Sequence, residues 1–183
     1  MPTMKASDEP QPSLAEWVAL CLVCEQPTHG FAIAGLLARD SDLGQIWHIQ
    51  KAVVYRALDR LERLGYIAAT GQEPSSLGPV KSPCRATPAG QRAASAWLNR
   101  PVDHPRNIRP ELLLKLALLD RIGANSAELL RRQRAQLAPI AAGLTDRLQD
   151  GTGPQRTLAL WRSESISATL RFLDAAGQLT SAR

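Results

Sequence analysis

The sequence has 183 residues, of which 44% are hydrophobic, and a formal net charge of +5. A chain of this length and composition can bury one good core or two small domains, which excludes disorder over the whole chain. The longest uncharged apolar stretch, residues 17–24, is well short of the ~20 residues that span a bilayer, so no membrane span is expected. Three cysteines are too few for a disulfide framework, and we expect a cytoplasmic protein.

Charged residues are distributed unevenly along the chain. Residues 1–44 hold two Lys or Arg against six Asp or Glu, and residues 45–100 hold eight against three. Residues 101–183 hold twelve against eight, a pattern typical of solvated helix faces. The middle segment is therefore where a nucleic-acid-binding element is expected.

The first elements are a disordered arm and two helices. Residues 1–12 contain three prolines and few apolar residues, which predicts the arm. Ser13 and Glu16 have capping-box spacing and open an apolar helix that runs to about Glu25. Thr28 is expected to cap a second helix that stops near Gly44; its apolar residues recur at helical spacing, at Phe31, Ile33, Ala34, Leu36 and Leu37.

A third helix is predicted from about Gln50 to Leu64, and Gly65 ends it. One face is apolar, with Val54, Ala57, Leu58 and Leu61. On the opposite face, Arg56, Arg60 and Arg63 project together beside the small residues Ala52 and Val53. Such a face suits a DNA groove.

A hairpin follows this helix. Residues 66–70 and 82–87 are predicted strands, and the Gly-, Pro- and Ser-rich residues 71–81 join them. Thr87 and Pro88 start a further helix that runs through Trp97. The order helix, helix, helix, hairpin, helix over residues 13–98 is typical of a winged helix-turn-helix domain.

The rest of the chain is predicted to be helical. Residues 99–109 are a connector, and residues 110–183 a helical domain for dimerisation and effector binding. Pro110 starts a helix to Ile122, and Asn125 or Ser126 starts a longer one with Leu130, Leu137 and Leu144 at heptad spacing, which Pro139 and Gly143 should kink or divide.

Residues 151–154 break the chain, and a last helix runs to about Ala176. Its stripe of Leu158, Trp161, Ser165, Ala168 and Phe172 either pairs two subunits or packs against the subunit's own helices.

Four blocks resemble the PadR family of bacterial regulators: residues 28–33, Trp47, residues 54–67 and residues 87–90. They correspond to the family's helix start, its Tyr-containing recognition helix with Leu-x-x-Leu-x-x-x-Gly-x-Ile, and its Thr-x-x-Gly. Gln50 departs from the family's small capping residue. Residues 84–88 replace the Tyr-containing segment that usually leads into the family's Thr-x-x-Gly block.

The fold expected is therefore mainly α with a two-stranded β-hairpin. The resemblance implies a homodimeric transcriptional regulator, a repressor that reads a palindromic operator and responds to a small aromatic effector. The side chains expected to bind double-stranded DNA are Gln50, Lys51, Tyr55, Arg56, Arg60, Arg63, Lys81 and Arg85.

Other functions find less support in the sequence. Cys21 and Cys24 have the spacing of a redox or zinc pair, yet they lie in an apolar helix without a second pair, which favours core packing. We expect no metal, no cofactor and no enzymatic activity, because neither a metal cluster, a phosphate loop nor a nucleophile motif is present. A winged helix that binds proteins instead of DNA is the main alternative.

Overall fold

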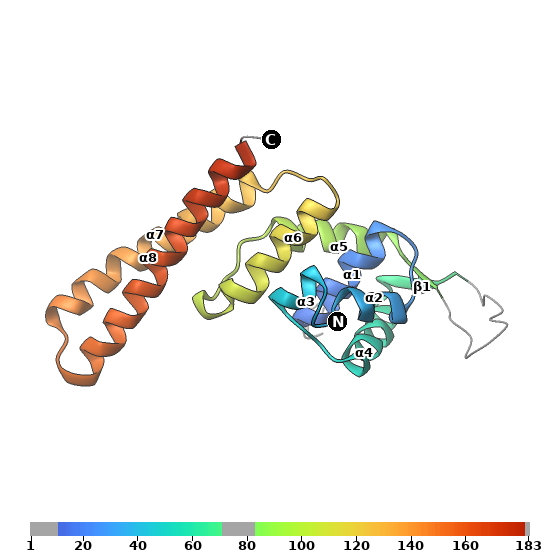
Figure 1. The fold of residues 1–183 in the computed structure, drawn as a ribbon, viewed down its shortest axis with the longest axis horizontal. Coiled ribbons are helices and arrows are strands. Elements are labelled where there is room, and N and C mark those ends of the chain that lie inside the picture. Colours follow the sequence, from blue (N-terminus) through green and yellow to red (C-terminus); the bar gives the residue numbers. More distant parts are fainter. Residues whose placement is uncertain (1–10, 71–82, 182–183) are drawn as a thin grey trace, which may run out of the picture. The chain divides into compact units, whose positions relative to one another are not determined.

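The computed structural model describes residues 11–70 and 83–181 (Figure 1). They form two compact units, one up to Ala94 and one from Ser95 onward. Within the described residues, all regular structure is helical except one two-stranded sheet, as predicted. Residues 1–10 of the expected arm and the whole linker of residues 71–81 lie outside the described residues.

Helix α1 (Leu14–Glu25) forms the centre of the first unit. The predicted capping box is present: the Glu16 N–H donates to Ser13 Oγ at 3.4 Å, and the Ser13 N–H donates to Glu16 Oε2 at 2.7 Å. The helix is apolar on all sides, as expected of a buried helix, and it contacts α4 and β2. Its fully buried side chains are Val18, Ala19, Leu20, Leu22 and Val23.

Helix α2 (Gly30–Leu36) begins with a cap that the sequence did not predict. His29, and not Thr28, is the N-cap, and its Nδ1 accepts from the Ala32 N–H at 3.1 Å. The backbone of Thr28 instead bonds to Cys84 in both directions, at 3.0 and 2.7 Å. Because this bridge keeps Thr28 extended beside the hairpin, the cap moves to the next residue.

The prediction that Gly44 stops the second helix is wrong. That helix ends at Leu36, and a separate short helix, α3 (Asp42–Ile46), contains Gly44. A Cβ at Gly44 would lie 1.7 Å from the carbonyl oxygen of Ala38, so the glycine permits a close backbone approach. The sequence alone does not distinguish this use of glycine from a helix stop.

Helix α4 (Lys51–Arg63) matches the predicted third helix closely. Gln50 is its N-cap, Leu64 its C-cap, and Gly65 follows with a φ of 69°, the left-handed conformation that ends many helices. The predicted inner face is confirmed, with Leu58 half-buried and three fully buried residues, Val54, Ala57 and Leu61.

Strands β1 (Ile67–Ala69) and β2 (Cys84–Ala86) form the predicted antiparallel hairpin. Ile67 and Cys84 point into the core, while Arg85 is exposed. The paired residues are Ile67 with Ala86, Ala68 with Arg85, and Ala69 with Cys84.

The junction between the hairpin and helix α5 (Pro88–Asn99) is built by Thr87 and Gly90. The Thr87 hydroxyl accepts from the Gly90 N–H at 3.1 Å and donates to the Gly65 carbonyl at 2.7 Å. A Cβ at Gly90 would lie 2.0 Å from the Tyr66 carbonyl oxygen. The glycine therefore lets the helix start lie directly against the end of α4.

Replacing Gly90 by alanine is expected to destabilise the first unit by about 1–3 kcal/mol, because the added methyl group must displace backbone. Gly35→Ala is the matched control: that glycine is helical with open space around it, so alanine there is expected to stabilise by about 0.5–1 kcal/mol. Urea denaturation measures both. Equal midpoints for Gly90→Ala and wild type would contradict the close approach.

After α5, the second unit continues with a helical run that starts earlier than predicted. A 3-10 turn, η1 (Pro105–Asn107), and a π-helical turn, η2 (Ile108–Leu112), precede helix α6 (Leu113–Arg121). Pro110 thus lies within the first turn of η2, and the helical run itself starts earlier, at Pro105. A proline is tolerated there because the N–H groups of a first turn lack intrahelical partners.

Helices α7 (Ala127–Asp150) and α8 (Gly153–Ser181) lie side by side (Figure 1). Ser126 is the N-cap of α7, as predicted. Helix α7 is not divided at Pro139, and α8 runs beyond the predicted end near Ala176 to Ser181. The proline costs one helical hydrogen bond.

Packing between α7 and α8 explains why neither helix stops early. Their buried side chains recur every seven residues, at Leu130, Leu137 and Leu144 on α7 and at Ala159, Ile166 and Leu173 on α8. Arg134 Nε and Asp174 Oδ1 form an ion pair at 2.6 Å, and Ser126 Oγ lies 3.4 Å from Thr180 Oγ1 near the end of α8.

A buried lysine lies between α5 and α6. Lys115 has no exposed surface, and its Nζ lies 2.9 Å from Glu111 Oε1 and donates to the Arg100 carbonyl at 2.7 Å. It also lies 4.7 Å from the centre of the Trp97 ring, a cation–π distance. Burial lowers the pKa of Lys115, and the hydrogen bond to Glu111 opposes this shift.

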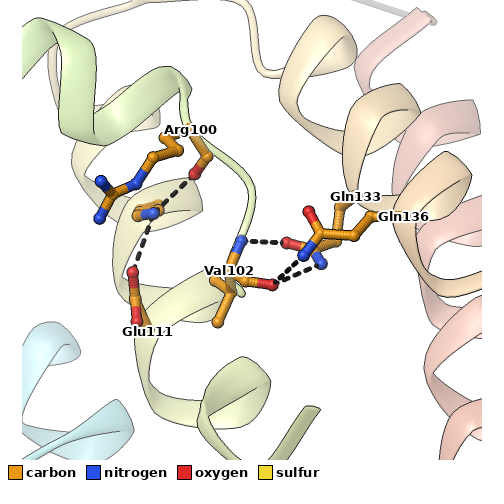
Figure 2. Close-up of polar contacts among 6 residues, drawn as sticks. Arg100, Val102, Glu111, Gln133 and Gln136 are labelled. Atoms are coloured by element: carbon orange, nitrogen blue, oxygen red, sulfur yellow. Dashed lines mark hydrogen bonds and ion pairs between the residues drawn. The ribbon is translucent and has the colours of Figure 1, made fainter. Parts of the chain in front are cut away.

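The connector is bound to α7 through glutamine side chains (Figure 2). The Val102 N–H donates to Gln133 Oε1 at 2.6 Å, and the Nε2 groups of Gln133 and Gln136 both donate to the Val102 carbonyl at 3.2 Å. Gln133 is fully buried. Its amide therefore satisfies both backbone polar groups of Val102.

Candidate nucleic-acid interface

The outward face of α4 carries most of the residues predicted to bind DNA. Its buried residues, centred on Val54 and Leu61, fix the helix against the core and leave the opposite side to solvent. Two carboxylates interrupt the positive charge on that side. The exposed residues of α4 are Lys51, Ala52, Tyr55, Arg56, Asp59, Glu62 and Arg63.

The start of α4 presents polar and aromatic groups together. Gln50 is exposed and makes no side-chain capping hydrogen bond, unlike the N-cap residues of α1, α2 and α3. Lys51 Nζ lies 5.0 Å from the centre of the Phe31 ring and 5.8 Å from that of Tyr55. The two rings thus hold the ammonium group at the exposed first turn, where a positive charge can meet a phosphate.

Phe31 lies on the surface, although its spacing predicted that it belongs to the apolar face of the second helix. Its exposed fraction is 56%, whereas Ile33 and Leu37 of the same segment are fully buried. Helical spacing alone did not separate them, because α2 is only seven residues long and a short helix defines its face poorly. We add Phe31 to the candidate interface on its contact with Lys51.

The three arginines of α4 line one hollow of about 450 Å³ beside the start of α1. Arg56 and Arg63 are exposed, whereas the Arg60 side chain is 31% exposed and its Nε lies 3.4 Å from Glu16 Oε1. Sequence periodicity predicted this grouping of arginines. It did not predict the carboxylate, because Glu16 is distant in sequence and was assigned only to the capping box.

The hairpin adds one described basic residue. Arg85 is exposed in the middle of β2, opposite Ala68. Lys81, the other predicted contact of the hairpin, lies outside the described residues. Arg85 is therefore the single cation of the described hairpin, and its side chain is long enough to reach a DNA phosphate.

Comparison with protein families agrees with this architecture. The model of the "Transcriptional regulator PadR-like family" matches residues 19–96, from the middle of α1 to the last turn of α5. Residues 19–96 are thus similar to this family. The family is one of transcriptional regulators, and the match covers the helices, the hairpin and the outward face of α4.

Solved structures similar to the whole chain were also found. Bacillus subtilis PadR in complex with operator DNA has 17% identity and a TM-score of 0.47, over 92% of this chain and 99% of that one. The same protein with p-coumaric acid has 16% identity and a TM-score of 0.42, over 94% and 98%. The Vibrio cholerae virulence activator AphA has 18% identity and a TM-score of 0.39, over 93% and 95%. Comparison with curated proteins gives no match.

The residues outside the range 19–96 include the predicted dimerisation stripe, and this stripe faces solvent. Trp161 is 70% exposed, Leu158 47% and Phe172 39%, and Ser165 and Ala168 are also exposed. Packing against α7 therefore does not bury the stripe. The residues of α8 that meet α7 lie on another side of the helix, at Ala159, Ile166 and Leu173.

The cysteines do not have the properties of a reactive pair. Cys21 is buried, and burial raises the pKa of the Cys24 thiol to about 11, so the Cys24 thiol is protonated at neutral pH. Among the described residues, no group of three or more His, Cys, Asp or Glu side chains is arranged to hold a metal ion. In the same ranges, no helix combines the length and apolarity of a membrane span.

Proposed function

We propose that the protein is a cytoplasmic transcriptional repressor that binds a palindromic operator as a homodimer. The observation that carries the proposal is the exposed basic face of α4 in a region similar to the PadR-like family. Helix α4 enters the major groove, where Gln50, Tyr55 and Arg56 reach base edges, and Lys51 and Arg63 neutralise phosphates. Arg85 of the hairpin contacts the neighbouring backbone, and Lys81 is assigned the same role.

Binding to DNA is tested by fluorescence anisotropy with the duplex upstream of the protein's own coding sequence and a shuffled duplex of the same composition. We expect preferential binding to the first duplex, with an affinity that falls linearly with salt on a double-logarithmic plot. Failure to bind both duplexes, and failure to select any sequence from a random pool, would instead favour a winged helix that recognises proteins.

Dimerisation is proposed because a single winged domain reads too short a site to be selective in a genome, and two half-sites require two copies. The exposed aromatic side chains of the α8 stripe support this assignment, since Trp and Phe are enriched in interface cores.

Trp161→Glu is expected to weaken dimerisation by at least about thirtyfold, because it places a charge where an apolar anchor is buried. Sedimentation equilibrium measures the dissociation constant. The matched control is Leu160→Glu, at an exposed apolar residue (50%) outside the stripe, which should leave the constant unchanged. Equal effects of the two substitutions would contradict the stripe as the contact.

A small aromatic effector that releases the repressor from DNA completes the proposal. It is carried by the family resemblance alone, and titration of the DNA complex with a panel of aromatic acids tests it. Release at a saturating concentration, with no effect of matched aliphatic acids, is the expected result.

A further inference from the structure

One acidic residue lies among the arginines of the proposed DNA interface without being part of α4. Glu16 belongs to the first turn of α1, and only 12% of its side chain is exposed. Its Oε2 accepts from the Ser13 N–H at 2.7 Å, and its Oε1 lies 3.4 Å from Arg60 Nε. The capping box therefore holds the carboxylate in a fixed position against α4.

The three arginines of the hollow differ in whether they pair with a carboxylate of the protein. Among the described residues, no ion pair of Arg56 or Arg63 is found, and both side chains are exposed. Arg60 lies on the flank of α4 that turns toward α1, where a fixed negative charge is already present. A cation that is neutralised within the protein releases no counterion on binding DNA, so it adds nothing to the salt-dependent affinity.

We propose that Glu16 withholds Arg60 from DNA phosphates, so that a residue of α1 sets how many phosphates the α4 surface neutralises. This inference rests on the proposed function. Glu16 acts as a positioning residue through Arg60. Its competitor is a backbone phosphate, which offers the guanidinium group the same charge and bidentate geometry as a carboxylate.

Glu16→Gln separates the charge of Glu16 from its structural role. A glutamine side-chain oxygen can still accept from the Ser13 N–H, so the capping box is kept while the charge is removed. Arg60 then loses its ion pair with Glu16 and can exchange to a phosphate. We expect the slope of log affinity against log salt to become steeper by about 0.9 per subunit, about 1.8 for the dimer, equally on the operator and on a shuffled duplex, because phosphate contacts carry no sequence information.

The experiment measures anisotropy of a labelled duplex over a salt series for full-length wild type, Glu16→Gln and the double variant Glu16→Gln with Arg60→Ala. The double variant is expected to return to the wild-type slope. Ser13→Ala is the control: it removes a hydroxyl cap but keeps the Glu16 charge, so its slope should equal that of wild type. Circular dichroism confirms that all variants are folded.

Two results would overturn the inference while leaving the proposed function intact. One is a Glu16→Gln slope equal to that of wild type. The other is a double variant whose slope is shallower than that of wild type by about 0.9 per subunit, about 1.8 for the dimer, since Arg60 would then already contact a phosphate in the wild-type complex. Absence of any DNA binding by the wild-type protein would instead refute the proposed function, and this inference with it.

Discussion

Arg56→Ala is expected to weaken operator binding by about 1–3 kcal/mol per half-site, the largest loss among single changes on α4. Arg56 lies in the middle of the exposed face, one helical turn after the small residue Ala52, so its guanidinium group can approach a base edge without obstruction. An arginine that binds guanine through O6 and N7 is the commonest specific contact in the major groove. Anisotropy on the operator and on a shuffled duplex measures the change.

The pattern of the loss distinguishes a base contact from a phosphate contact. If Arg56 reads a base, its loss should reduce the preference for the operator over the shuffled duplex; a phosphate contact would weaken both equally. Arg92→Ala, at an exposed arginine of α5, is the matched control and should leave both affinities unchanged. Equal effects of Arg56→Ala and Arg92→Ala would remove α4 from the proposed interface.

Lys115→Met is expected to destabilise the second unit by about 2 kcal/mol. Methionine fills a similar volume, but Glu111 loses its partner and the Arg100 carbonyl loses its donor. Breaking a fully buried ion pair costs about 3–5 kcal/mol, and we expect less here because 19% of the Glu111 side chain reaches solvent. Urea denaturation followed by circular dichroism and tryptophan fluorescence measures the loss.

The matched control is the double variant Lys115→Met with Glu111→Gln, in which no charge is left uncompensated. It should recover part of the stability lost in the single variant. If the double variant is no more stable than the single one, packing and not the ion pair accounts for the loss.

The same lysine predicts a dependence of stability on pH. Because burial lowers its pKa in the folded protein, the unfolded chain binds more protons between the folded and unfolded pKa values. The free energy of unfolding should therefore rise with pH across that alkaline interval. Lys115→Met should remove this rise, which a series of urea titrations detects.

The sequence predicted the elements whose signals are local. The capping box of α1, the limits of α4 and the Thr87–Pro88 start of α5 are each set by residues within a few positions of one another. The two faces of α4 could be predicted for the same reason, because its apolar and basic residues recur at helical spacing within one helix.

The errors arose where distant segments decide the outcome. Thr28 does not cap the second helix because it forms a bridge with Cys84. Gly44 does not stop a helix; it allows the backbone of Ala38 to approach closely. The extension of α8 to Ser181 depends on its packing against α7.

The candidate site shows the same limit. The outward positions of Arg56 and Arg63 followed from the helical period. The exposure of Phe31 and the pairing of Glu16 with Arg60 depend on how α1, α2 and α4 pack, and no pattern within one helix encodes that arrangement.

The binding of Val102 by Gln133 has a consequence for which substitutions the connector tolerates. Gln133 recognises only the backbone of Val102, and a backbone N–H and carbonyl are present at every position except proline. Another apolar residue at position 102 should therefore be accepted, whereas proline there, or a leucine at position 133, should not. An insertion or deletion in the connector would move a different peptide group opposite the amide, so the length of this segment matters more than its composition.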